Sequence, residues 1–91
     1  MKRDFKHINL LINEAIEESN AFIEIYELEL KYYKKHLRYL DENKPLQFMK
    51  RKYKAYLDNR EETLNNINNC NLKIQEELKI IDELIKSLGS E

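Results

Sequence analysis

The 91-residue sequence contains one glycine, one proline, one cysteine and no tryptophan. Sharp turns, hairpin turns and phosphate-binding loops usually need glycine, and Gly89 lies next to the C-terminal end, so we expect none of the three. A single cysteine cannot form an internal disulfide, which excludes the small disulfide-stabilised scaffolds. The length allows one domain and excludes a doubly wound nucleotide-binding fold, a barrel or a two-domain enzyme.

Long apolar runs are scarce as well. No stretch approaches the roughly 20 apolar residues of a membrane span, and the N-terminal segment has no run of roughly 7–15 apolar residues typical of a secretory signal. Residue 2 is lysine and the last three residues are glycine, serine and glutamate, so we expect no lipid anchor. We therefore predict a cytoplasmic protein with no membrane partner. Frequent Asn, Ile and Lys favour a bacterial or phage source.

The sequence does contain two long patterns of apolar residues that recur three and four positions apart. This spacing is the period of an amphipathic helix. The first pattern covers residues 5–40 and the second covers residues 46–88, with no glycine or proline inside either. Two long helices joined by a short loop form an antiparallel hairpin. We predict a single all-α domain over residues 1–91, a coiled-coil-like two-helix hairpin.

The only strong break between the two patterns is at Pro45. Proline suits the first turn of a helix, where its missing N–H needs no partner, and Asn43 is a good capping residue for that turn. We predict one helix over about residues 4–40, a turn over about 41–45 and a second helix over about 45–88.

A turn centred near residue 43 or 44 pairs residues whose numbers add to about 87. Leu30 then meets Leu57, and Cys70 lies opposite about residue 17.

An alternative to one continuous second helix is a break in it, because Asp58 and Glu61 have the spacing of a capping box. We favour a continuous helix there, since neither proline nor glycine is present.

Apolar residues also lie outside the predicted seam between the helices. A helix that is apolar around more than half its girth is normally covered on more than one side. We therefore expect dimerisation, in which two hairpins complete a four-helix bundle, or docking on a heterologous helical protein. Partial exposure of tyrosines is the alternative explanation. The predicted protein interface comprises Ala21, Ile25, Leu28, Tyr32, Tyr39, Ile80 and Leu84.

The net charge of −1 hides a strong segregation. Residues 31–60 carry ten basic and three acidic side chains, whereas residues 1–30 and residues 61–91 each carry three basic and seven acidic ones. A hairpin therefore has a basic loop end and an acidic open end. Basic residues interleaved with tyrosines suit an anionic partner such as nucleic acid. The candidate contacts are Lys31, Lys34, Lys35, Arg38, Lys50, Arg51, Lys52 and Lys54.

Residues for catalysis or metal binding are few. His7 and His36 are the only histidines, and they lie about 43 Å apart on one predicted helix. Neither has a glutamate three residues before it, zinc-ligand spacing is absent, and Cys70 has no histidine opposite it. We predict no catalytic residue, no cofactor, no metal and no small-molecule substrate.

In size and hairpin shape, the chain is similar to the small helical-hairpin substrates of type VII secretion. Those proteins carry a Trp-x-Gly motif in the turn, whereas the turn from Asp41 to Pro45 has neither residue. The resemblance is architectural and implies no function. Our first interpretation is a non-enzymatic interaction protein, a small intracellular regulator or assembly adaptor. The alternative is a small nucleic-acid-binding protein that uses the basic, tyrosine-containing loop end.

Overall fold

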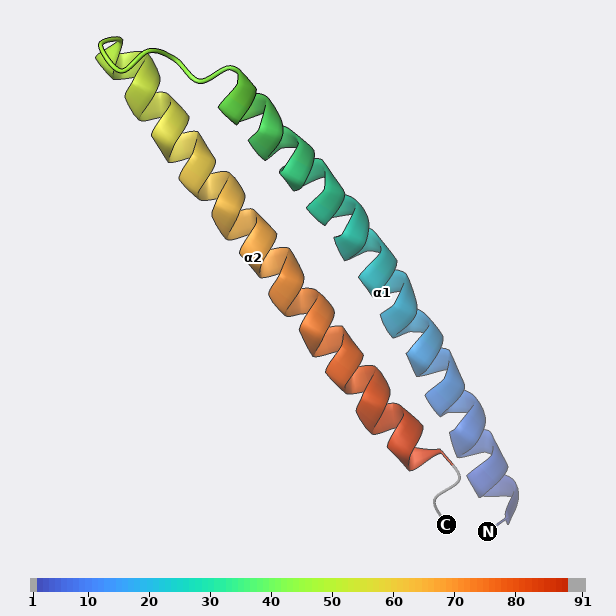
Figure 1. Cartoon of the computed structure of the whole chain (residues 1–91). Helices are drawn as coiled ribbons and strands as arrows, with labels where there is room; N and C mark the ends of the chain where they lie inside the picture. The colour runs from blue at the N-terminus through green and yellow to red at the C-terminus, as the bar shows by residue number, and fades with distance from the viewer. Residues whose placement is uncertain (1, 89–91) are drawn as a thin grey trace.

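The chain folds into two long antiparallel helices that lie side by side (Figure 1). The computed structural model describes residues 2–88, with side chains from Lys6 onward, and it contains no strand within that range. Helix α1 covers Lys2–Glu42 and helix α2 covers Lys50–Ser87. The molecule is a rod with principal extents of 73 × 14 × 13 Å. The prediction of an all-α two-helix hairpin is confirmed.

Helix α2 passes through Asp58 without a break. At its C-terminal end the N–H of Leu88 donates to the carbonyl oxygen of Ile85 at 3.1 Å. Lys86 lies in the last turn, where a positive charge interacts favourably with the helix dipole. The helix ends at Ser87, close to the predicted end at about residue 88. Neither described helix has a stretch long and apolar enough to cross a bilayer.

The second helix begins at Lys50, so the predicted start at about residue 45 is wrong. Asn43 does not cap α2. Its side-chain amide donates to the carbonyl oxygen of Tyr39 at 2.8 Å, and its backbone N–H donates to the same oxygen at 3.0 Å. Carbonyls in the last turn of a helix have no partner within the helix, and Asn43 satisfies one of them on α1.

Pro45 lies in the connection between the helices and not in the first turn of α2. Its ring crowds the preceding residue and disfavours a helical backbone at Lys44, so the chain continues without helical structure before the next turn. Residues 44–46 have no regular secondary structure. The N–H of Met49 then donates to the carbonyl oxygen of Leu46 at 3.0 Å and closes a turn that leads into α2.

The register between the helices also differs from the prediction. Cys70 approaches Glu29 and Tyr56 approaches Asp41, so paired residue numbers add to 99 and 97 and not to about 87. This difference corresponds to sliding one helix by about 11 residues, or roughly three turns. A slide of whole turns brings the same helix faces together again, so the apolar stripes fit both registers. Cys70 is therefore opposite Glu29 and not residue 17.

The long connection and the shifted register leave the helices staggered. In Figure 1 the first turns of α2 project past the end of α1, and α1 projects past the end of α2 at the opposite end of the rod. The first turns of α2 therefore have no partner helix beside them. This stagger places the basic start of α2 at the extremity of the molecule.

The seam between the helices is thin. Among the described side chains the buried residues are Ser19, Thr63 and Cys70, and no large side chain is fully buried. These three residues are small, which lets the helices approach each other closely. Most other residues of the seam, such as Ile12 and Leu30, are half-buried. A single two-helix seam thus supplies little of the apolar burial that normally stabilises a small domain.

Candidate interaction surfaces

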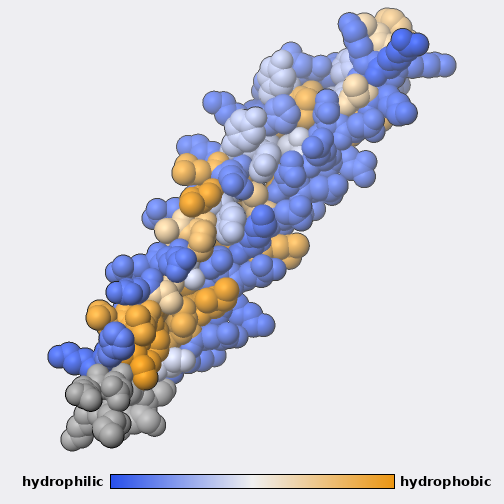
Figure 2. Space-filling view, turned by 180° about the vertical axis from the view of Figure 1, so that it is seen from behind, coloured by the Kyte–Doolittle hydropathy of each residue, from blue (hydrophilic) through white to orange (hydrophobic). Residues whose placement is uncertain are grey.

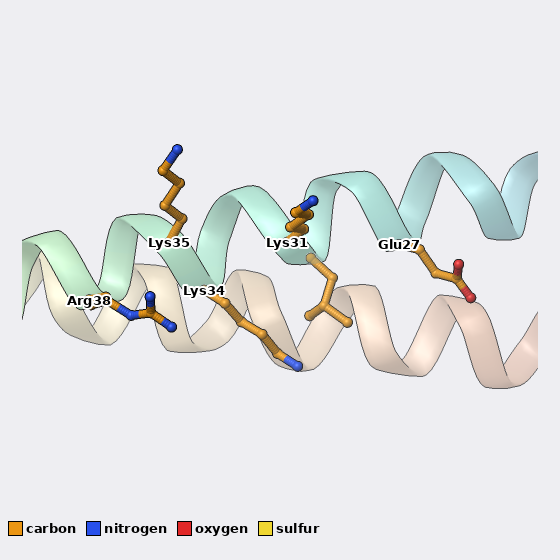
Figure 3. Close-up of a pocket in the computed structure, with 6 residues that line it drawn as sticks. Glu27, Lys31, Lys34, Lys35 and Arg38 are labelled. Carbon is orange, nitrogen blue, oxygen red and sulfur yellow. The ribbon is translucent and has the colours of Figure 1, made fainter.

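Four of the predicted anion contacts line one shallow groove on α1. The groove is formed by Glu27, Leu30, Lys31, Lys34, Lys35 and Arg38. These residues recur three and four positions apart, so they occupy one side of the helix. Figure 3 shows that all of the labelled side chains come from α1 and that their charged ends spread apart instead of converging on one point. Such an open array suits an extended anionic surface better than a single small anion.

Aromatic rings stack along an adjacent part of α1. The ring centroids of Tyr32 and His36 are 6.2 Å apart with an interplanar angle of 5°, and those of His36 and Tyr39 are 6.3 Å apart at 17°. Tyr32 and Tyr39 are exposed, while His36 is half-buried between them. We call Tyr32, His36 and Tyr39 the aromatic ladder. Tyr33 meets the edge of Tyr32 at 5.5 Å and turns toward the seam.

The other four predicted anion contacts lie elsewhere. All are exposed, and they are in the first turns of α2, beyond the end of α1: Lys50, Arg51, Lys52 and Lys54. The structure therefore does not gather the eight basic residues into one pocket. It divides them between the groove on α1 and the extremity of the rod. We call residues 44–54 the tip.

Sequence reasoning missed two apolar residues of the tip. Leu46 was expected in the seam but is 61% exposed, and Phe48, which had no assigned role, is 77% exposed. One signal in the sequence sets Phe48 apart. It does not fit the apolar spacing that links Leu46, Met49 and Tyr53, and the half-buried Met49 and Tyr53 do follow that spacing.

A polar cluster joins the end of α1 to α2 just behind the tip. The hydroxyl of Tyr56 donates to Asp41 Oδ1 at 2.7 Å, and Arg60 Nε donates to the same oxygen at 3.1 Å. The hydrogen bond from Tyr56, supported by Arg60, holds the pKa of Asp41 below its ordinary value. The same bond raises the pKa of Tyr56. Lys44 adds a cation–π contact, with Nζ 5.8 Å from the ring centre of Tyr53.

The surroundings of the cysteine disfavour its ionised form. Burial raises the pKa of the Cys70 thiol, and the nearby Glu29 carboxylate raises it further. The thiol donates weakly to Glu29 Oε2 at 3.8 Å. A raised pKa disfavours the thiolate, which is the reactive form. Within the described residues, no cluster of three or more His, Cys, Asp or Glu side chains has a geometry that could hold a metal ion.

Most of the predicted protein interface is open to solvent. Ala21, Ile25, Leu28, Tyr32 and Tyr39 are all exposed on α1, with Leu28 at 68%. On α2, Ile80 is exposed and Leu84 is half-buried. Figure 2 shows the hydrophobic side chains gathering toward the end of the rod that carries the chain termini. The α1 residues form one continuous stripe away from the seam, which we call the outer stripe.

No family model matches the sequence, and neither a curated protein nor a solved structure gives a significant match. We therefore infer what the chain does from the surfaces described above.

Proposed function

We propose that this chain is a non-enzymatic protein–protein interaction module, which acts in the cytoplasm as a small regulator or assembly adaptor. The observation that supports this proposal best is that few apolar side chains are buried and many are exposed. Cys70 is the buried apolar residue of the described chain, while Ile25, Leu28 and Ile80 lie in solvent. Apolar area gains about 25 cal/mol per Å² when it is removed from water, so an outer stripe of this kind favours association.

The partner that we propose first is a second copy of the chain. Two antiparallel hairpins can bury their outer stripes against each other in a four-helix bundle. The loop half (residues 31–60) has a net charge of +7, and the two outer segments each have −4. An antiparallel dimer therefore brings the basic half of one copy beside the acidic half of the other. This arrangement lowers the electrostatic energy of the dimer.

The experiment is to measure mass by light scattering at micromolar concentration. We expect the unmodified chain to have twice the mass of the monomer and Leu28→Asp to have the monomer mass, since a charge in the outer stripe would have to be buried. The matched control is Leu72→Asp, because Leu72 is 56% exposed on α2 and lies outside the predicted interface. A monomeric mass for the unmodified chain would contradict self-association, and a heterologous partner would then be the occupant.

A second candidate function is nucleic-acid binding, which the aromatic ladder beside the basic groove favours. Exposed tyrosine rings provide faces on which bases stack, and lysines contact phosphates. Lys31→Glu with Lys34→Glu should abolish binding of single-stranded oligonucleotides in a gel shift at low salt. Tyr39→Ala should weaken the binding and preserve its salt dependence. Absence of any shift with the unmodified chain at low salt would exclude this function.

A further inference from the structure

The tip of the rod combines exposed apolar side chains with a concentrated positive charge. Phe48 is the most exposed of the large apolar residues in the described chain, at 77%, and Leu46 lies two positions before it. Both belong to the connection between the helices, past the end of α1. The stagger of the helices means that neither α1 nor the body of α2 covers them.

The charge of this segment has one sign. From residue 43 to residue 57 the sequence contains five basic residues and no acidic one. The basic residues are Lys44, Lys50, Arg51, Lys52 and Lys54, and all of them are exposed. Figure 2 shows pale orange atoms among blue ones at the extremity of the rod opposite the termini. Apolar groups surrounded by cations are the pattern of a surface that contacts an anionic membrane.

We propose that the tip binds the surface of an anionic lipid bilayer. The side chains of Leu46 and Phe48 enter the region between headgroups and acyl chains, and the basic residues around them contact lipid phosphates. From the sequence we predicted no membrane partner, because no segment can span a bilayer. Contact with the bilayer surface does not require a span, since a few apolar side chains and a basic cluster provide two reinforcing attractions.

The composition of the tip favours a bilayer over a nucleic acid. The bases of a nucleic acid stack on aromatic side chains, and Leu46 has no aromatic ring. The exposed tyrosine rings that stack on His36, those of Tyr32 and Tyr39, lie on α1, and within residues 44–54 Phe48 is the one exposed aromatic ring. Moving any apolar side chain from water into a bilayer is favourable in free energy, so binding to a bilayer accounts for the exposure of both Leu46 and Phe48.

Insertion can be measured directly, because the chain has no tryptophan of its own. Phe48→Trp introduces a single tryptophan at the tip, and Leu72→Trp introduces one on the exposed side of α2. We expect the emission of Phe48→Trp to shift to shorter wavelength with vesicles of phosphatidylcholine and phosphatidylglycerol, and not with phosphatidylcholine alone. The emission of Leu72→Trp should not shift with either vesicle.

Affinity is measured by co-sedimentation with the same vesicles. Replacing both apolar residues, Leu46→Ser with Phe48→Ser, should lower vesicle affinity by at least about tenfold. The matched control, Leu72→Ser with Leu78→Ser, should leave it unchanged. Lys50→Gln with Lys52→Gln should lower affinity by about 25-fold, since each basic residue near an anionic surface contributes roughly fivefold.

The bilayer proposal is independent of dimerisation and can fail separately from it. Leu28→Asp should lose the dimer mass and keep its binding to vesicles. Far-UV circular dichroism of each variant establishes that the hairpin is intact. The proposal is overturned if the unmodified chain does not sediment with anionic vesicles. It is also overturned if the tip variants bind vesicles as well as the controls do, or if the basic tip binds oligonucleotides and not vesicles.

Discussion

The loop half of the rod (residues 31–60) and the open half (residues 1–30 and 61–91) share one fold but use different chemistry. In the loop half, solvent-accessible polar side chains join the two helices, such as Asp41 with Tyr56 and Arg60. In the open half, the described polar contacts across the seam include the long Cys70–Glu29 hydrogen bond of 3.8 Å.

The exposed apolar residues of the two halves also differ in chemical type. Those of the open half are mostly aliphatic, such as Leu10, Ile80 and Ile85, whereas those of the loop half include Tyr32 and Tyr39. The hydroxyl of tyrosine forms hydrogen bonds with water, whereas for an aliphatic side chain only removal from water lowers the free energy. The exposed surface of the open half is therefore the more aliphatic of the two, and that of the loop half is richer in tyrosine and positive charge.

The largest effect is expected in the buried seam of the open half. Cys70→Asp places a second carboxylate in a buried position beside Glu29. An uncompensated buried charge typically costs about 3 kcal/mol or more, so we expect the free energy of unfolding to fall by at least that amount. Urea unfolding followed by circular dichroism measures it. Leu72→Asp, with the same new charge two residues away in solvent, should change it by less than about 0.5 kcal/mol. Equal losses in both variants would mean that the seam is not closed at Cys70.

An intermediate effect compares an aliphatic and a tyrosine residue of the predicted protein interface. Ile80→Asp and Tyr39→Asp place the same charge in the predicted interface, one in each half of the rod. We expect Ile80→Asp to raise the dissociation constant of the dimer by at least about 30-fold, since a charge in place of a buried aliphatic side chain costs about 2 kcal/mol or more. Tyr39→Asp should raise it by less than about tenfold. Sedimentation equilibrium gives both constants, and the reverse order would show that the tyrosine side contributes more to the dimer than the aliphatic side.

The smallest effect concerns the polar cluster of the loop half. The pKa of Asp41 is lowered from its ordinary value of 3.8. A group with a lowered pKa in the folded state contributes stability above its ordinary pKa, and that contribution is lost as the pH falls through the lowered value. Asp41→Asn should therefore unfold at a slightly lower temperature than the unmodified chain at pH 7, and the difference should vanish in acid.

The control for this titration is Glu42→Gln, which removes the same charge from the neighbouring residue. It should give a smaller difference in unfolding temperature at pH 7. A difference for Asp41→Asn that stays constant from neutral pH into acid would show that the Asp41 carboxylate does not stabilise the loop half by its charge.

The candidate surfaces were only partly predictable. The charge segregation is a count along the chain, so the order of residues alone reveals it. The division of the basic residues between the α1 groove and the tip was not predictable in this way, because it depends on where α2 begins. Leu46 shows the difficulty: its spacing fits the apolar stripe, but the backbone turns between Leu46 and Met49 and leaves it in solvent.

The neighbouring residues Tyr56 and Leu57 give a second example. Both fit the apolar spacing, and the structure turns Tyr56 toward the seam and leaves Leu57 exposed. The selection depends on Asp41, which accepts a hydrogen bond from the Tyr56 hydroxyl at 2.7 Å. That residue is 15 positions away, and its proximity exists only in the folded register.

The sequence by itself determined two long helices and a hairpin, because the period of apolar residues and a single proline are local properties. It did not determine the register, because sliding the helices by three whole turns brings the same faces together. The tertiary structure decided between these registers through the length of the connection and the contacts that Asp41 and Cys70 make across the seam. The stagger that results exposes Phe48 at the extremity of the rod, where its surroundings are basic and no helix covers it.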